Sequence, residues 1–364
     1  MVGGHRAGVR AAGWPGGGLR RGREPHRSAP ARGSDQRVVR VGVVGAGRHA
    51  NNALYPSILE AGFDLVAVCA RTPASAASTA GRWGAGRHHT SVEDMLAAGG
   101  LDGVVVAVPP AAYRPILARC IEARMPVFCE KPGGQRASEL RDLAVLAAEA
   151  RTEVVVGYMK RFAPAYQSAR EVIGSAGFGS PSLAHFTFAM GRFDEYLADL
   201  RHYLIDNPVH MIDLARYLVG ELDEISAVLN VVPAVGLSVS VVARAEGGAA
   251  CSFDFCTTAS FTHRGEFVEV YGQGDAVQVD NVDTCTYRPA DRPAEVRRPN
   301  YTLPTSSNSS WTVLGFVPAL HHFRDVVAGL ADNRSDLESA ARTLETTELI
   351  WHRLEPSWAV LRHG

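Results

Sequence analysis

Short runs of branched apolar residues alternate with helix-like segments over the first half of the chain. Strand-like runs occupy residues 38–44, 65–70, 104–108, 127–129 and 154–157. Helix-like segments lie between them, at residues 51–61, 74–83, 92–98, 112–123 and 138–150. A strand that is apolar along its whole length is expected where helices cover both faces of a parallel sheet. The pattern therefore predicts a doubly wound, parallel α/β domain over residues 37–157.

The second half of the chain alternates apolar and polar residues instead. Residues 183–188 and 267–272 show this alternation, which is typical of antiparallel strands with one face in solvent. A helix-like segment around residues 210–218 interrupts the strands, and two more, 316–330 and 337–354, end the pattern. We predict an α+β domain over residues 158–364, with a large open mixed or antiparallel sheet and terminal helices.

Residues 1–36 differ from both halves. They hold seven arginines, nine glycines and three prolines, with few large aliphatic residues. Such a segment cannot bury enough apolar surface to offset the entropy lost on ordering. We predict either a disordered basic arm or a start site placed too far upstream. In both cases a chain starting at Arg37 is expected to keep its fold and activity.

The charge balance argues against several kinds of partner. With 37 basic and 38 acidic residues the formal net charge is -1, so neither nucleic acid nor an anionic membrane is expected as a partner. No apolar run approaches the roughly 18 residues of a membrane-spanning helix. Six cysteines without a C-x-x-C pair fit reduced thiols, so we expect a cytoplasmic protein. The two His-His pairs, at residues 88–89 and 321–322, lack acid or cysteine partners at ligand spacing, so no metal site is expected.

A glycine-rich turn follows the first strand-like run and precedes a helix-like segment. Gly45 permits a tight turn, Gly47 lets the backbone approach a pyrophosphate, and the small Ala50 allows close packing of helix on strand. The helix N-terminus supplies amides and partial positive charge for the phosphates. This context predicts a dinucleotide site of the Rossmann type, with Arg48 and His49 also among its cofactor-binding residues.

The end of the second strand-like run bears on which nicotinamide cofactor is bound. NAD-binding chains usually carry an acid there for the ribose 2′-hydroxyl, whereas this chain has Ala70-Arg71-Thr72. Without that carboxylate nothing repels a 2′-phosphate, and Arg71 offers a bidentate partner while Thr72 offers a hydroxyl. NADP(H) is therefore favoured, and NAD(H) is possible. Stacking of Arg71 on adenine is the alternative role.

A second group of residues has the chemistry that hydride transfer at a carbinol requires. Such a reaction needs a proton acceptor and a positive group beside the reacting oxygen. Because a histidine can titrate near neutral pH, His210 is the candidate acid/base, and Lys131, after a parallel strand, is the candidate electrophile. Asp206 shares the face of His210 if this stretch is helical, and so can orient the imidazole or bind a substrate hydroxyl. Glu130 is expected to position Lys131 or to touch the nicotinamide ribose.

The order and spacing of these motifs resemble the glucose–fructose oxidoreductase, inositol dehydrogenase and MocA (Gfo/Idh/MocA) family, over about residues 40–354. The shared motifs are the glycine turn, Glu130-Lys131-Pro132 and Asp206-x-x-x-His210-x-x-Asp213. The resemblance implies a Rossmann domain followed by a substrate-binding α+β domain. It also implies a homodimer or homotetramer formed through the open C-terminal sheet.

The resemblance adds four further candidate residues. Val108 and Pro109 are similar to the family's turn beside the nicotinamide, and Tyr113 stands on the same wall where a histidine is common. Arg161 is similar to an arginine at the entry to the second domain, where it either reaches substrate or braces the hinge. The substrate-binding residues implied in this way are Lys131, Arg161, Asp206 and His210.

The function implied is NAD(P)-dependent hydride transfer between nicotinamide and a secondary hydroxyl or ketone of a sugar, nucleotide sugar or cyclitol. One alternative is a glycoside hydrolase that keeps NAD bound and cleaves by transient oxidation. Another is a non-catalytic nucleotide-binding regulator, against which the presence of Lys131 and His210 argues.

Overall fold

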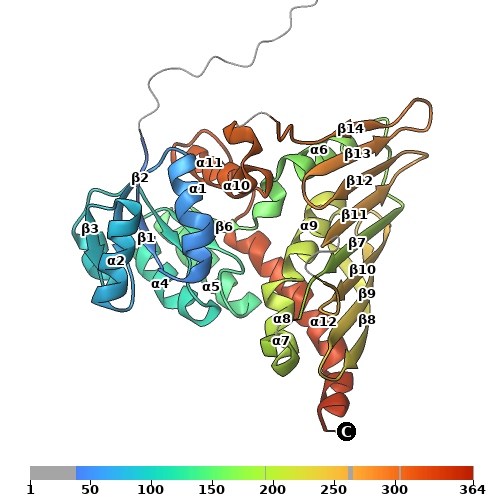
Figure 1. The fold of residues 1–364 in the computed structure, drawn as a ribbon, viewed down its shortest axis with the longest axis horizontal. Coiled ribbons are helices and arrows are strands. Elements are labelled where there is room, and N and C mark those ends of the chain that lie inside the picture. The colour runs from blue at the N-terminus through green and yellow to red at the C-terminus, as the bar shows by residue number, and fades with distance from the viewer. Residues whose placement is uncertain (1–37, 193, 261–264, 303–304, 364) are drawn as a thin grey trace, which may run out of the picture. The chain divides into compact units, whose positions relative to one another are not determined.

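Six parallel strands form the first sheet, in the order β3-β2-β1-β4-β5-β6 (Figure 1). The strands are β1 (Arg40–Val44), β2 (Asp64–Cys69), β3 (Arg87–His89), β4 (Gly103–Val106), β5 (Val127–Glu130) and β6 (Val154–Gly157). Every residue of β4, β5 and β6 is buried, as a sheet covered on both faces requires. The predicted doubly wound parallel sheet is confirmed.

Helices connect these strands and supply the covering layers. They are η1 (Ala50–Leu54), a π-helical stretch continuous with α1 (Tyr55–Glu60), then α2 (Pro73–Trp83), α3 (Val92–Ala97), α4 (Pro110–Glu122) and α5 (Ala137–Ala150). Ser91 caps α3 through a hydrogen bond that its side chain accepts from the amide of Asp94. The computed structural model describes residues 38–192, 194–260, 265–302 and 305–363, and the arm predicted over residues 1–36 lies outside them.

The second sheet has eight strands in the order β14-β13-β12-β11-β7-β10-β9-β8. They are β7 (Leu183–Ala189), β8 (Leu222–Val232), β9 (Gly236–Ala245), β10 (Ala250–Cys256), β11 (Glu266–Tyr271), β12 (Ala276–Asp280), β13 (Thr284–Arg288) and β14 (Glu295–Arg297). Strands β7 and β10 pair in parallel and the other neighbours are antiparallel. The predicted mixed sheet is thereby confirmed.

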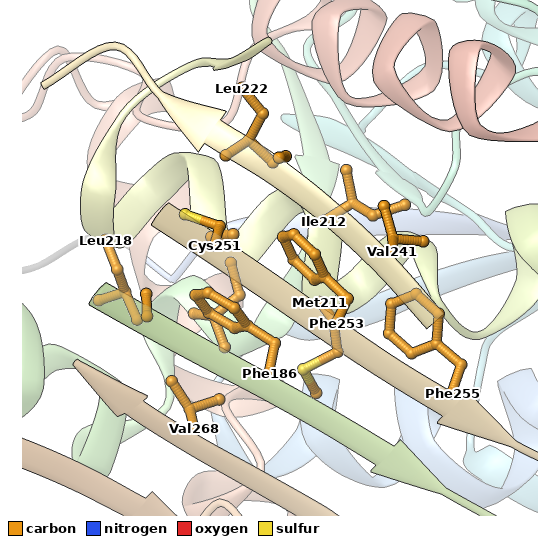
Figure 2. Packing of buried hydrophobic residues seen from close by; sticks show 14 of the residues in the cluster. Phe186, Met211, Ile212, Leu218, Leu222, Val241, Cys251, Phe253, Phe255 and Val268 are labelled. Carbon is orange, nitrogen blue, oxygen red and sulfur yellow. The ribbon is translucent and has the colours of Figure 1, made fainter. Parts of the chain in front are cut away.

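Helices cover one face of this sheet, and the other face is open (Figure 1). The covering layer contains α6 (Pro164–Ile173), α7 (Asp194–Ala198), α8 (Leu200–Asp206), α9 (Val209–Val219) and α12 (Leu337–His363). Between sheet and helices lies a core in which Phe186 stacks on Phe253 with a centroid distance of 4.9 Å, beside Met211 and Ile212 of α9 (Figure 2). On the open face Val228 and Val242 are 71% and 55% exposed. Alternation of buried and more exposed residues along β7 and β11 is the physical basis of the alternating pattern at residues 183–188 and 267–272.

The C-terminal segment returns to the first sheet. It continues through η3 (Ser306–Asn308), α10 (Ser310–Val313) and α11 (Phe316–Val327). Phe323 of α11 packs edge-on against Phe128 of β5, with 6.0 Å between ring centroids, and belongs to the same buried cluster as Val41 of β1. Leu344 of α12 joins the cluster on the other face of that sheet. The last helices therefore complete the core of a sheet formed some 200 residues earlier.

All six cysteines are free thiols, and Cys256 is the one that is not fully buried. Within the described ranges, no helix is both long enough and apolar enough to cross a membrane. The described residues also contain no group of three or more His, Cys, Asp or Glu side chains that could hold a metal ion.

Candidate active site

A cavity of about 570 Å³ lies at the carboxyl ends of the parallel strands β1, β4 and β5. In open α/β sheets this edge is where ligands bind. Its opposite wall comes from the end of α8 and the first turn of α9, so both halves of the chain contribute. The lining residues are Gly47, Arg48, His49, Ala50, Asn52, Ala107, Val108, Pro109, Pro110, Tyr113, Glu130, Lys131, Pro132, Met159, Asp206, Asn207, His210 and Phe316.

The glycine turn between β1 and η1 forms one end of the cavity. Gly45 has φ +129°, and a Cβ atom there would lie 2.1 Å from the carbonyl oxygen of Ala107, so no other residue fits. A Cβ atom added at Gly47 would meet no heavy atom within 4 Å, so a ligand can approach the backbone of Gly47 closely. The turn is held by the hydroxyl of Tyr55, which donates to the carbonyl of Gly45 at 2.7 Å.

Lys131 follows β5 and reaches across the cavity to α8. Its Nζ donates to the main-chain oxygen of Asp206 at 2.5 Å and to Asp206 Oδ1 at 2.9 Å. Burial alone would raise the pKa of Asp206, but the charge of Lys131 and the hydrogen bonds from Tyr196 and Lys131 hold it below its usual value. At neutral pH this pair is therefore an ammonium fixed by a carboxylate.

Asp206 and His210 lie on two helices rather than on one. Helix α8 ends at Asp206 and α9 begins at Val209, because Pro208 has no amide hydrogen with which to continue the ladder. The carboxylate of Asp206 faces Lys131 and Tyr196 instead of the imidazole. The expectation that Asp206 orients His210 on a shared helix face is therefore replaced by a role in which it holds Lys131.

His210, in the first turn of α9, lines the cavity beside Lys131 and is itself only 8% exposed. Burial lowers its pKa well below 6.5, and the positive charges of Lys131 and Lys160 lower it further. Its Nδ1 is buried and has no hydrogen-bond partner in the described part of the chain. The imidazole is thus neutral at neutral pH, the form that can accept a proton.

His49 and Glu130 meet at the other side of the cavity. His49 Nε2 lies 3.5 Å from Glu130 Oε1, and the interaction with this buried carboxylate raises the pKa of His49. Arg48, the neighbour of His49, also lines the cavity. Arg48 thus places positive charge near the glycine turn, next to the His49–Glu130 pair.

Four candidate residues do not line the cavity. Gly45 shapes its turn from behind. Arg71 and Thr72 lie between β2 and α2, where the Thr72 hydroxyl accepts a hydrogen bond from the amide of Ser75 at 3.2 Å and so caps α2. Arg161, in the 3₁₀ helix η2 (Met159–Phe162), is buried and binds both carboxylate oxygens of Asp213, at 2.7 and 2.5 Å. Its guanidinium therefore stabilises the contact with Asp213 and is not directed at the cavity.

Two residues beside the site were not predicted from the sequence. Tyr196 of α7 donates a hydrogen bond to Asp206 Oδ2, and Asn207 donates to the Tyr196 hydroxyl at 2.6 Å. Tyr196 precedes Asp206 by ten residues, and the turn between α7 and α8 brings them together. No local sequence signal encodes that turn, so the contact could be found only from the fold.

The cavity fits a dinucleotide cofactor. Gly47 leaves room for a close backbone approach, and Arg48 provides positive charge for a pyrophosphate. Glu130 Oε1 is buried and has His49 Nε2 at 3.5 Å, too far for a good hydrogen bond, so this oxygen can accept one from a cofactor hydroxyl. Tyr113, Val108 and Pro109 supply an apolar wall opposite.

Comparison with known proteins agrees with this geometry. A family model described as "Oxidoreductase family, NAD-binding Rossmann fold" matches residues 39–158, and the GFO/IDH/MocA C-terminal domain matches residues 166–278. The two matches place a NAD-binding Rossmann fold and the C-terminal domain of one family in the same chain. The chain belongs to the Gfo/Idh/MocA oxidoreductase family, as its motifs indicated.

Two relatives illustrate the degree of sequence similarity. Inositol 2-dehydrogenase of Acidothermus cellulolyticus is 34% identical over 195 residues, which cover 53% of this chain and 57% of that protein. Inositol 2-dehydrogenase of Rhizobium meliloti is 27% identical over 255 residues, covering 67% of this chain and 76% of that protein. The first of these alignments thus spans little more than half of the relative's length.

Solved structures share the fold at lower identity. A dehydrogenase from Chromobacterium violaceum aligns with a TM-score of 0.80 at 22% identity, covering 90% of this chain and 98% of that one. A levoglucosan dehydrogenase in complex with NADH and L-sorbose aligns with a TM-score of 0.76 at 17% identity, covering 88% and 98%. At these identities the likeness establishes the architecture alone.

Proposed function

We propose that this protein is a nicotinamide-dependent dehydrogenase or reductase acting on a secondary hydroxyl or ketone of a polyhydroxylated ring. The observation that carries the proposal is that Lys131 and a neutral, buried His210 line the same cavity as the glycine turn. The naming of relatives as inositol 2-dehydrogenases supports a cyclitol or sugar as the substrate class.

The side chains divide the proton chemistry between them. The cofactor, when bound, accepts or supplies the hydride. His210 is neutral because burial lowers its pKa, so its ring has a nitrogen lone pair that can accept the proton of the reacting hydroxyl. The ammonium of Lys131 can stabilise negative charge on the substrate oxygen. Asp206 holds that ammonium in place, through contacts of 2.5 and 2.9 Å, without occupying His210.

Replacing Lys131 or His210 by Ala tests this assignment. Each variant is expected to lose about two orders of magnitude or more in turnover, since acid–base and electrostatic contributions are each of that size. Binding of the reduced cofactor, followed by fluorescence titration, is expected to survive. The control is His88→Ala, which removes an exposed histidine of β3. Turnover close to normal in both active-site variants would contradict the proposed chemistry.

We propose further that NADP(H) is the preferred cofactor. Arg71 is exposed just beyond β2, and the acid that usually binds the ribose is replaced by the buried Ala70. Arg71→Ala is expected to weaken NADPH binding by about tenfold or more while changing NADH binding little, because only NADPH carries the 2′-phosphate. Ala70→Asp is expected to act in the opposite sense and favour NADH.

Dissociation constants of both reduced cofactors for the unaltered chain and these two variants decide the preference. Tighter NADH binding in the unaltered chain, with no selective effect of Arg71→Ala, would rule it out. Arg71 would then be at most an adenine-stacking residue.

The open face of the second sheet supports a proposal about assembly. Val228 and Val242 are exposed there, and a sheet face with unpaired apolar side chains is a candidate interface. We expect a homodimer or homotetramer that buries this face. A location in the cytoplasm is also proposed, supported by the six free cysteines.

A further inference from the structure

A second, smaller cavity of about 290 Å³ adjoins the candidate active site. The two cavities share Pro109 and Pro110 as a common wall. A space of this size can hold a charged substituent of a ligand whose ring lies in the adjoining cavity. Its lining residues are Pro109, Pro110, Ala111, Gln135, Arg136, Asp199, Arg201, His202 and Ile205.

The charge of this cavity is positive on balance. Arg136 and Arg201 line it, and Asp199 is the single acid among the lining residues. Asp199 Oδ1 already accepts a hydrogen bond from the amide of His202 at 3.0 Å, as the cap of α8. An incoming anion therefore meets two guanidinium groups against one carboxylate that is turned to the backbone.

Neither arginine is tightly bound to a carboxylate. Arg136 forms no ion pair with any described residue. Arg201 Nη2 lies 4.0 Å from Glu348 Oε1 and 3.5 Å from the carbonyl of Gln135, at the outer limit of an ion pair and of a hydrogen bond. Guanidinium groups bind carboxylate or phosphate through two parallel hydrogen bonds, and here both groups are available to do so.

Helix α8 connects this cavity to the reacting groups. Arg201 is in its first turn, and Asp206, which holds Lys131, is its last residue. Five residues of helix rise by about 7–8 Å, which is comparable with the span of a six-membered ring and one substituent. Because the two cavities share Pro109 and Pro110, a ring at Lys131 can extend a charged group past these prolines toward Arg201.

We propose that this second cavity is an oxyanion subsite, and that the substrate is a polyhydroxylated ring bearing a carboxylate or phosphate group. This inference rests on the proposed function and specifies its substrate class. The shared chemistry of the two groups is recognition by paired guanidiniums, and the choice between them is left to the experiment.

Calorimetric titration of the protein saturated with reduced cofactor tests the subsite without requiring turnover. The probes are glucose, glucuronate and glucose 6-phosphate. At least one acidic sugar is expected to bind about tenfold more tightly than glucose, since a charge-assisted contact is worth at least that factor. Glucuronate and glucose 6-phosphate separate carboxylate from phosphate recognition.

Arg136→Gln and Arg201→Gln are each expected to remove most of this preference while leaving glucose binding unchanged. The matched control is Arg114→Gln, which removes an exposed arginine on the neighbouring α4 that pairs with Asp142 at 3.5 Å. Equal binding of the three sugars, or a preference that survives in both Gln variants, would overturn the subsite.

Turnover assays distinguish this failure from failure of the proposed function. Selective binding of the acidic sugars without any hydride transfer would keep the subsite and reject the enzymatic proposal. Oxidation of neutral polyols with no preference for charged ones would keep the enzymatic proposal and reject the subsite.

Discussion

At the scale of single residues, the state of Asp206 depends on a tyrosine from a different helix. The carboxylate is half-exposed, yet its pKa lies below the usual value because Lys131 and Tyr196 both interact with its charged form. A group with a depressed pKa keeps its favourable interactions above that pKa and loses them as the pH falls through it. The Lys131–Asp206 pair should therefore weaken on the acid side of the activity profile.

Tyr196→Phe removes one of these interactions and should raise the pKa of Asp206 toward its ordinary value. The acid limb of the profile of kcat/KM against pH is then expected to move to higher pH. At this half-exposed site the lost bond is worth about 1 kcal/mol, or roughly fivefold in kcat/KM on the acid side. A full pH profile of the variant measures the shift.

Tyr203→Phe is the matched control for this prediction. Tyr203 is a buried tyrosine of α8 whose hydroxyl has no hydrogen-bond partner among the residues that the structure describes. Its loss should leave the acid limb in place. An identical effect of both substitutions would show that packing, rather than the hydrogen bond to Asp206, is responsible.

At the scale of elements, the turn between β1 and η1 separates a structural glycine from a ligand-facing one. Gly45→Ala places a methyl group 2.1 Å from the carbonyl oxygen of Ala107. The positive φ alone costs about 1–3 kcal/mol, so a clear loss of stability is expected in urea unfolding. Gly47→Ala meets no neighbour within 4 Å, and its stability should stay within about 0.5 kcal/mol of the unaltered chain.

Cofactor binding should respond differently from stability. The methyl group of Gly47→Ala projects from a residue that lines the cavity, so the dissociation constant of the reduced cofactor is expected to rise by about tenfold or more. Unchanged binding in that variant would show that the cofactor does not approach Gly47.

The helices and strands also show how much of the fold could be predicted from the sequence. The uninterrupted apolar runs predicted five of the six strands of the parallel sheet because both of its faces are covered, and the alternation near residues 183–188 predicted β7. Strand β3 was not predicted, because its three residues, Arg87–His89, form no apolar run. Lys131 and His210 were predicted to belong together, and they line one cavity. A shared helix face for Asp206 and His210 was expected only if the stretch between them is helical, and the break at Pro208 separates α8 from α9 there.

Contacts between distant parts of the chain were the hardest features to predict from the sequence. The apolar face of α11 predicts a buried helix but cannot say that Phe323 packs on Phe128. The same holds for Tyr196, whose contact with Asp206 arises from the turn between two short helices. Such pairings are decided by tertiary packing, which no local pattern encodes.

At the scale of the whole molecule, Arg161 ties together three segments. It binds Asp213 of α9 through two hydrogen bonds, the carbonyl of Arg334 at 2.7 Å, and Ser339 of α12 at 2.9 Å. Both charged groups of the Arg161–Asp213 pair are nearly inaccessible, at 6% and 1% of their side chains. Removing one partner would leave the other buried and unpaired.

Arg161→Met is therefore expected to lower the free energy of unfolding by about 3–5 kcal/mol. The control is Arg244→Met, which breaks an exposed pair with Glu224 at 2.9 Å. That change should cost about 0–1 kcal/mol, because solvent screens the pair. Urea unfolding of both variants measures the difference, and equal losses would contradict a bracing role for Arg161.

Because most of the cysteines are buried, the reactivity of their thiols can be used to follow opening of the folded state. Burial raises the pKa of Cys69, Cys251 and Cys285 to about 11 and that of Cys120 to about 12. At pH 8 the thiolate fraction at a pKa of 11 is roughly one part in a thousand, so alkylating reagents meet almost no nucleophile. These thiols, set in both sheets and in α4, become reactive only when their surroundings open. The rate at which these thiols are alkylated under native conditions therefore reports how often the folded state opens. Cys256, which is not fully buried, should react first and serves as the reference.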